Sequence, residues 1–355
     1  PRRGQTALMW AAAEGHVGVI DLLIEAGADF RASLDSGFTP LMFAVRQGHI
    51  AAAKALLKAG VDVNGPVQVR ANPKLPDGER PIRAGTTPLD LAIANAHFEL
   101  AAALLDAGAD PNSNRLGYTA LHMLVYIRRP GIGDNDPGPE GSGTMSSLEL
   151  ARKLVTKGAD VNARITRRVN LTNTRFHDIG ASPYLQAAIT ADAEYMKLLV
   201  ELGADPSLTN AEGSTALMTA AGLGTRSPGE DAGTEEDVIE TMQLALDHGA
   251  DINAVDVNGE TAMHGAAYKN LPGAVKFLAE KGAKIDVWNR PNKYGWTPLT
   301  IARGYRFGNF KPSAVTVAAI EQVMLAAGMV PPSEKDIDAK GYDIYAPENR
   351  RKPQP

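Results

Sequence analysis

Apolar and polar residues follow one another in short blocks along most of the chain, and glycine marks many of the block boundaries. An alanine-rich block such as residues 11–13 is followed by Gly15 and then by a block that contains leucines, as at Leu22 and Leu23. Alanine lets a helix lie close to its neighbours, and glycine permits a tight turn into a second helix. The pattern therefore predicts an all-α chain built from pairs of short helices.

The same phrase opens each of eight units. It reads Gly-x-Thr, then Ala or Pro, then Leu or Met, and only the fifth copy departs from it, as Ser182-Pro183-Tyr184. A second phrase, Gly-Ala-Asp or close to it, closes most units, as at Gly27 and Gly60. The units open at Gly4, Gly37, Gly85, Gly117, Gly180, Gly213, Gly259 and Gly295. Self-similarity of this kind is typical of repeat proteins.

Each phrase has a mechanical meaning. A Thr or Ser before Pro or Ala is a helix N-cap, because its hydroxyl accepts a hydrogen bond from an otherwise unpaired amide and Pro is tolerated at the first helical position. The closing glycine stands where a left-handed residue ends a helix, and the polar residues after it form a turn. Each unit is therefore predicted to be a helix, a turn, a second helix and a hairpin.

The opening phrase, the central Gly-His of Gly15-His16 and Gly48-His49, and the closing phrase together resemble the ankyrin repeat, a unit of 33 residues. The resemblance covers roughly residues 1–330, which we expect to form a single array, with residues 331–355 as a charged tail. It implies an ankyrin-repeat solenoid of about eight helix-turn-helix units with projecting hairpin loops. It also implies a non-enzymatic scaffold that binds another protein on its concave face. The long insertions give a narrower resemblance to ankyrin arrays of exported bacterial proteins.

Departures from the 33-residue spacing indicate insertions of two kinds. Residues 66–84 and 164–179 lengthen hairpins into two fingers, whereas residues 129–147, 224–237 and 303–312 lie between the two helices of a unit. Insertions at equivalent joints of stacked repeats emerge on the same side of the array. We therefore expect the hairpin insertions and the inter-helix insertions to line opposite edges of the solenoid.

Charge follows the same division. The hairpin insertions carry eight basic and three acidic residues, and the first two inter-helix insertions carry two basic and eight acidic residues. The basic fingers are expected to present Arg70, Arg80, Arg164, Arg167, Arg168 and Arg175. A basic edge fits an acidic protein partner, although loops are also charged simply because they are solvated. The total of 36 Lys and Arg against 41 Asp and Glu argues against nucleic acid as a partner.

The resemblance places the variable residues around each opening glycine, and those at the end of each first helix, on the concave surface. Tyr, Trp and Arg dominate binding hot spots. The candidate contact residues are Phe38, Arg46, Arg115, Tyr118, Tyr126, Ile179, Tyr268, Lys269, Trp288, Tyr294, Trp296 and Tyr305. The alternative for the last aromatic residues is that they seal the final repeat.

Two rival functions remain open. Trp288, Tyr294 and Trp296 could form a stacking platform for a carbohydrate or polymer. An enzyme is the other rival, but the sequence offers it only His177 and Asp178, without a nucleophile beside them.

The chain contains no cysteine, which removes thiolate, iron–sulfur and Cys-based zinc chemistry. We therefore expect no cofactor and no metal. The missing cysteines also suit an oxidising compartment, which favours export over the cytoplasm. No apolar run reaches the ~18 residues that would span a membrane, so no membrane insertion is expected. The apolar first helix suggests that further repeats or a domain N-terminal to Pro1 cover Met9 and Trp10.

Overall fold

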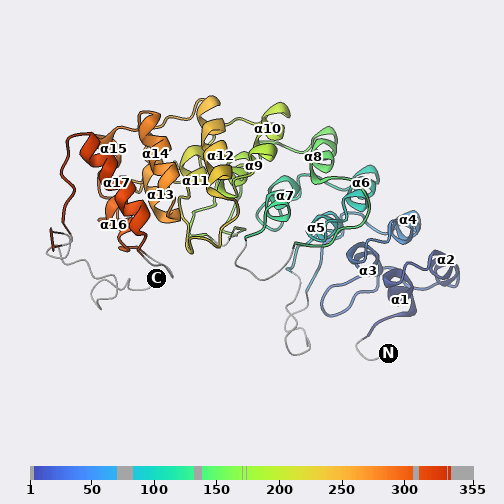
Figure 1. Cartoon of the computed structure of the whole chain (residues 1–355). Coiled ribbons are helices and arrows are strands. Elements are labelled where there is room, and N and C mark those ends of the chain that lie inside the picture. The colour runs from blue at the N-terminus through green and yellow to red at the C-terminus, as the bar shows by residue number, and fades with distance from the viewer. Residues whose placement is uncertain are drawn as a thin grey trace. The chain divides into compact units, whose positions relative to one another are not determined.

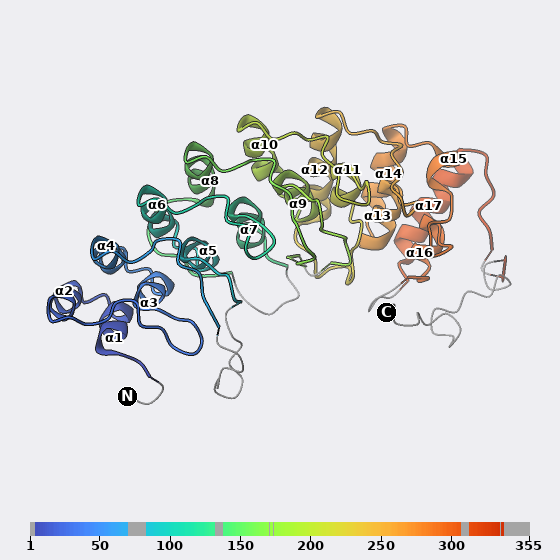
Figure 2. The same ribbon diagram turned by 180° about the vertical axis from the view of Figure 1, so that it is seen from behind.

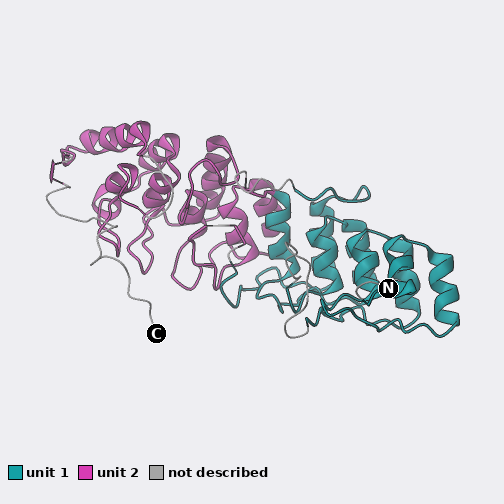
Figure 3. Ribbon diagram, turned by 90° about the horizontal axis from the view of Figure 1, so that it is seen from below, with its two compact units in different colours: residues 1–128, 136–169 teal, residues 129–135, 170–355 magenta. Residues whose placement is uncertain are grey.

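In the computed structural model the described residues are 4–69, 83–131, 138–169, 171–172, 174–306, 312–333 and 335–336. Helices are the only regular elements among these residues (Figure 1). The chain divides into two compact units (Figure 3): unit 1 comprises residues 1–128 and 136–169, and unit 2 comprises residues 129–135 and 170–355.

Each repeat contributes two helices, and within each unit the first helices of neighbouring repeats pack side by side, as do the second helices (Figures 1 and 2). The first helices are α1 (Ala7–Ala13), α3 (Pro40–Arg46), α5 (Pro88–Ala94), α7 (Ala120–Arg128), α9 (Pro183–Ile189), α11 (Ala216–Ala220), α13 (Ala262–Lys269) and α16 (Pro298–Ala302). The second helices are α2 (Val17–Glu25), α4 (Ile50–Lys58), α6 (Phe98–Asp106), α8 (Ser147–Thr156), α10 (Ala193–Glu201), α12 (Glu235–Asp247), α14 (Pro272–Glu280) and α17 (Ala314–Ala326). A single additional turn, α15 (Ile285–Trp288), follows α14. The eight predicted helix pairs are confirmed.

The predicted N-caps are also present. The hydroxyl of Thr39 accepts the amide of Met42 at 3.3 Å, and the hydroxyl of Ser182 accepts the amide of Leu185 at 3.3 Å. These bonds satisfy amides that the helix itself leaves unpaired. The departure of the fifth phrase from Thr to Ser therefore keeps the same cap.

The core lies between the two rows of helices. Ala44 and Ala92 in the first helices and Leu56 and Leu104 in the second are all fully buried. The small alanine side chains let adjacent first helices approach closely, and each buried leucine contributes about 2 kcal/mol of apolar burial. The abundance of alanine is thus a packing requirement.

The turn between the two helices of a repeat is tied to the preceding repeat. His49 Nε2 lies 3.0 Å from the carbonyl oxygen of Ala13, and His97 Nε2 lies 3.1 Å from that of Arg46. The residue before each histidine has a positive φ, which glycine adopts without strain at Gly48 but which Ala96 must also adopt at 54°. Later in the chain, Ala191 has the same φ of 54°.

The inter-helix insertions fold back onto neighbouring turns. In unit 1, the Ser142 hydroxyl lies 2.9 Å from His97 Nδ1, and Glu99 Oε1 accepts the amide of Thr144 at 2.8 Å. In unit 2, the amide of Arg175 donates to the carbonyl of Gly224 at 2.7 Å. A hairpin insertion and an inter-helix insertion therefore meet, so the expectation that the two kinds line opposite edges is wrong at this point.

The two ends of the described chain differ from expectation in one respect. Met9 is buried within the chain, whereas Trp10 is 55% exposed. Cover of the exposed Trp10 by a preceding segment stays a prediction. At the other end, Arg303 donates to the carbonyl of Pro332 at 2.8 Å, which draws the first residues of the tail back onto the last repeat. No helix among the described residues is long and apolar enough to cross a membrane.

Candidate functional site

The residue directly after the opening glycine points into the stack of repeats. Phe38 is 4% exposed, Tyr118 is 7% exposed and Trp296 is 2% exposed. Serine, threonine and glutamate at this position in other repeats are equally buried, as at Ser214 and Glu260. The interpretation of these three aromatic residues as an exposed contact surface is therefore corrected, because their side chains are part of the packing.

Three further candidates at other positions are also buried. Trp288 is 2% exposed. The Tyr268 hydroxyl donates to Glu260 Oε1 at 3.1 Å, and the Lys269 ammonium donates to the carbonyl of Ala232 at 3.0 Å. These side chains hold the array together and are not available to a partner.

The remaining candidates reach the surface. Arg46 and Arg115 are exposed, and the Arg46 guanidinium lies 5.5 Å from the ring centroid of Phe38. Phe38 therefore packs beneath a candidate contact residue. The half-buried candidates are Tyr126, Ile179, Tyr294 and Tyr305.

The hairpin edge of unit 1 presents a cluster of exposed arginines, which we call the arginine ridge: Arg83, Arg115, Arg167 and Arg168. Arg83 and Arg115 occupy the same register, two residues before an opening glycine, in neighbouring repeats. The Arg115 side chain lies against the backbone of Gly85, because a Cβ on that glycine would be only 3.3 Å from Arg115 Cβ. Successive hairpins thus place their arginines side by side.

Arg167 is held in place by backbone carbonyls. Its Nη2 donates to the carbonyl of Arg115 at 2.8 Å and its Nε to that of Leu116 at 3.2 Å. The pKa of Tyr118 is raised, first by burial and then by the charge of Asp90, while the charges of Arg83 and Arg167 act in the opposite direction. Neither Arg83 nor Arg115 forms an ion pair with a carboxylate of the described residues.

The other predicted finger arginines have separate positions. Arg164 is half-buried in unit 1, and Arg175 is exposed in unit 2. Arg70 and Arg80 lie outside the described residues. The ridge therefore combines Arg83, Arg167 and Arg168 of the two predicted fingers with Arg115 of the hairpin between them.

The C-terminal aromatics do not form an open platform. Trp288 and Trp296 are buried, and only Tyr294 is partly accessible, with its ring centroid 4.9 Å from that of Trp296. A sugar must stack on exposed ring faces, so the alternative of a carbohydrate platform made of these three rings is corrected.

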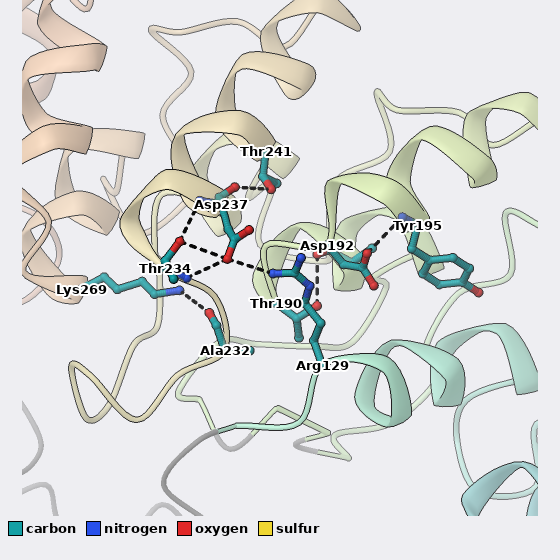
Figure 4. A network of polar contacts seen from close by, with 10 residues as sticks. Arg129, Thr190, Asp192, Tyr195, Ala232, Thr234, Asp237, Thr241 and Lys269 are labelled. Atoms are coloured by element: carbon teal, nitrogen blue, oxygen red, sulfur yellow. Dashed lines mark hydrogen bonds and ion pairs between the residues drawn. The ribbon is translucent and has the colours of Figure 1, made fainter. Parts of the chain in front are cut away.

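Polar contacts in unit 2 join the predicted insertion over residues 224–237, whose last three residues begin α12, to its surroundings (Figure 4). Arg129 pairs with Asp237 at 3.2 Å, and the amide of Thr234 donates to the same carboxylate at 2.9 Å. The Thr234 amide, followed by the Arg129 guanidinium, lowers the pKa of Asp237 against the effect of burial. Asp237, an acid of the predicted inter-helix insertion, is thus used inside the array.

The two residues considered for an enzyme, His177 and Asp178, lie in the hairpin before the fifth repeat. His177 Nδ1 is buried and has no hydrogen-bond partner among the described residues, and Asp178 is 3% exposed. In the described part of the chain no three His, Asp or Glu side chains are grouped as they would be to bind a metal ion.

Comparisons with known proteins agree with this architecture. A family model for ankyrin repeats in three copies matches residues 1–66 and 232–310, and a model for a single ankyrin repeat matches residues 84–115. The chain is an ankyrin-repeat protein. Repeats of this family typically serve as non-enzymatic scaffolds for protein–protein interaction.

Among individual relatives, the chain is 28% identical over 192 residues to neurogenic locus notch homolog protein 1 of Homo sapiens and 29% identical over 189 residues to that of Mus musculus. These matches cover 54% and 53% of this chain but only 6% of each relative.

Among solved structures, the fold is similar to the human ASB11 ankyrin repeat domain, with a TM-score of 0.54, covering 79% of this chain and 99% of that one. It is also similar to the ankyrin repeat domain of Bcl-3, with a TM-score of 0.52, covering 73% and 93%. Both are 20% identical to this chain and establish the fold alone.

Proposed function

We propose that this chain binds an acidic segment of another protein through the arginine ridge of unit 1. The observation that carries the proposal is the alignment of Arg83, Arg115 and Arg167 on successive hairpins, with Arg167 fixed to two backbone carbonyls. A guanidinium that is already ordered loses less conformational entropy when it forms a bidentate bond with a carboxylate.

The neighbouring aromatic residues support the same surface. Tyr118 fills the space beneath the ridge and Tyr126 reaches the surface at the end of α7. Arg46 occupies the position equivalent to Tyr126 in an earlier repeat, seven residues after the N-cap threonine. A partner that lies along the hairpins would therefore meet charged groups first and a limited apolar area beside them.

The test measures binding of a fluorescein-labelled twelve-residue Asp/Glu peptide by fluorescence anisotropy. The Arg83→Glu/Arg115→Glu double variant is expected to weaken binding at least tenfold, which corresponds to about 1.4 kcal/mol, and the affinity of the wild-type chain should fall as salt rises.

The matched control is Lys54→Glu/Lys58→Glu on α4 of the same unit, which reverses the same number of charges away from the hairpins. Equal weakening by the control would contradict the assignment to the ridge. Single-stranded DNA of the same charge binding as tightly as the peptide would show general attraction of anions and would contradict a protein partner.

A further inference from the structure

A second surface lies on the outer helices of unit 2, away from the hairpins. Three second helices, α10, α12 and α14, are neighbours in this unit (Figures 1 and 2). Their side chains line an open groove of about 490 Å³. The groove is lined by Lys197 of α10, by Glu236, Ile239, Glu240, Gln243, Leu244 and Asp247 of α12, and by Phe277 of α14.

The floor of the groove is apolar. Ile239 and Leu244 stand about 7.5 Å apart along α12, from a rise of about 1.5 Å per residue, and Phe277 projects from the adjacent helix. All three are half-buried, so each still offers apolar surface. The floor therefore has room for two or three apolar side chains from a partner.

The rim of the groove is acidic. Helix α12 carries five acidic residues and no basic residue. Two of the five act within the array: Asp237 pairs with Arg129, and Glu235 accepts the amide of Gly273 at 2.5 Å. The other three, Glu236, Glu240 and Asp247, line the groove together with Lys197, which pairs with Glu240 at 2.7 Å while both side chains remain more than half exposed. A second cation, Lys281, lies 5.4 Å from the ring centroid of Phe277, so acids outnumber bases at the groove by three to two.

We infer that this groove binds a basic amphipathic helix of a partner protein. A helix with leucine-like residues on one face would place them on the apolar floor, and its flanking Lys or Arg residues would meet the carboxylates of the rim. The charge of the rim selects against an acidic helix. The groove lies on a different unit from the arginine ridge and takes a partner of the opposite charge.

The probe is a labelled fourteen-residue Leu/Lys peptide with its leucines on one helical face. Two variants test the two parts of the groove: Ile239→Ser/Leu244→Ser alters the floor, and Glu236→Lys/Glu240→Lys alters the rim. The matched control is Asp21→Lys/Glu25→Lys on α2, which reverses two exposed acids at the same i, i+4 spacing. Circular dichroism melting shows whether each variant is folded.

Both groove variants are expected to weaken binding at least tenfold, and the control to change it less than twofold. A peptide of the same composition with its leucines scattered around the helix should bind at least tenfold more weakly than the amphipathic one. Equal binding of the two peptides, or equal weakening by the α2 control, would overturn the inference in favour of plain charge attraction. A self-association of the wild-type chain, measured by sedimentation, that the floor variant abolishes would also overturn it, because a second copy would then be the occupant.

Discussion

Asn292 Nδ2 donates a hydrogen bond to Glu260 Oε1 over 2.8 Å, so the hairpin before the eighth repeat is joined to the hairpin before the seventh. Glu260 is 5% exposed, and its Oε2 has no hydrogen-bond partner among the described residues. Burial and then the nearby charge of Asp256 raise the pKa of Glu260 from 4.5 to about 8. The folded protein therefore holds this proton more tightly than the unfolded chain does.

This shift predicts a loss of stability on the alkaline side. The contribution of Glu260 is fully favourable below pH 4.5, the value of the unfolded chain, and is lost as the pH rises towards 8. Glu260→Gln keeps the oxygen that accepts from Asn292 and cannot ionise. In urea unfolding the wild-type chain should lose roughly 2–4 kcal/mol relative to Glu260→Gln between pH 5 and pH 9. A constant difference across that range would contradict the prediction.

Ala191 offers a stabilising substitution. Its φ of 54° is strained for a residue with a Cβ, and the equivalent position in the first two repeats is glycine, Gly15 and Gly48. Ala191→Gly should raise the free energy of unfolding by about 0.5–1 kcal/mol, measured by thermal or urea unfolding. Ala188→Gly, inside α9, should have the opposite sign because glycine weakens a helix interior. If both variants destabilise the chain, strain at residue 191 is not significant.

Glu235 caps a helix in the next repeat. Helix α14 has no side-chain cap of its own, and Glu235 Oε1 accepts the amides of Gly273 at 2.5 Å and Ala274 at 3.3 Å. Glu235→Ala should therefore destabilise the chain by about 1–2 kcal/mol. The exposed neighbour Glu236 serves as the control, since Glu236→Ala should change stability by less than about 0.5 kcal/mol. Equal losses for the two variants would rule out the capping role.

A comparison of alanine substitutions at Gly117 and Gly158 separates the cost of steric crowding from the cost of backbone strain. Gly117 and Gly158 have nearly equal φ values of 93° and 92°, but a Cβ on Gly117 would lie 2.5 Å from Arg167 Cγ, whereas nothing lies within 4 Å of one on Gly158. Alanine at either position should cost about 1 kcal/mol from the backbone alone. Gly117→Ala should cost about 1–2 kcal/mol more and should also weaken binding of the acidic peptide, because Arg167 must move. Equal costs in denaturant unfolding would contradict the crowding.

The sequence predicted the helices well because their signals are local. A threonine or serine before the first helix caps it within three residues, as Thr39 does, so the opening phrase alone specifies each start. The candidate contact surface was harder, because burial at Phe38, Tyr118 and Trp296 depends on where the next hairpin lies. A serine, a threonine or a glutamate occupies the same position elsewhere, so residue type gives little indication that the position is buried.

The acidic groove was missed for a similar reason. Three of the five acids of α12, Glu235, Glu236 and Asp237, were assigned to an inter-helix insertion. Phe277 is more than thirty residues further along the chain than Leu244. Only the stacking of α12 on α14 brings the apolar floor and the acidic rim together. The sequence signal for this groove is the placement of two apolar residues, Ile239 and Leu244, among acids such as Glu236 and Glu240 that recur at helical spacing.

Polar partners in this array are commonly drawn from adjacent repeats: His49 reaches Ala13, His97 reaches Arg46, and Glu235 reaches Gly273. The smallest piece that can be removed without leaving such groups unpaired is therefore a whole repeat, not a helix. Lengthening a loop leaves these pairs intact, whereas cutting out one helix breaks pairs on both sides of the cut. The array can therefore change in length only in steps of one repeat. Each added or removed repeat must leave the hydrogen-bond donors and acceptors of the adjacent repeats paired.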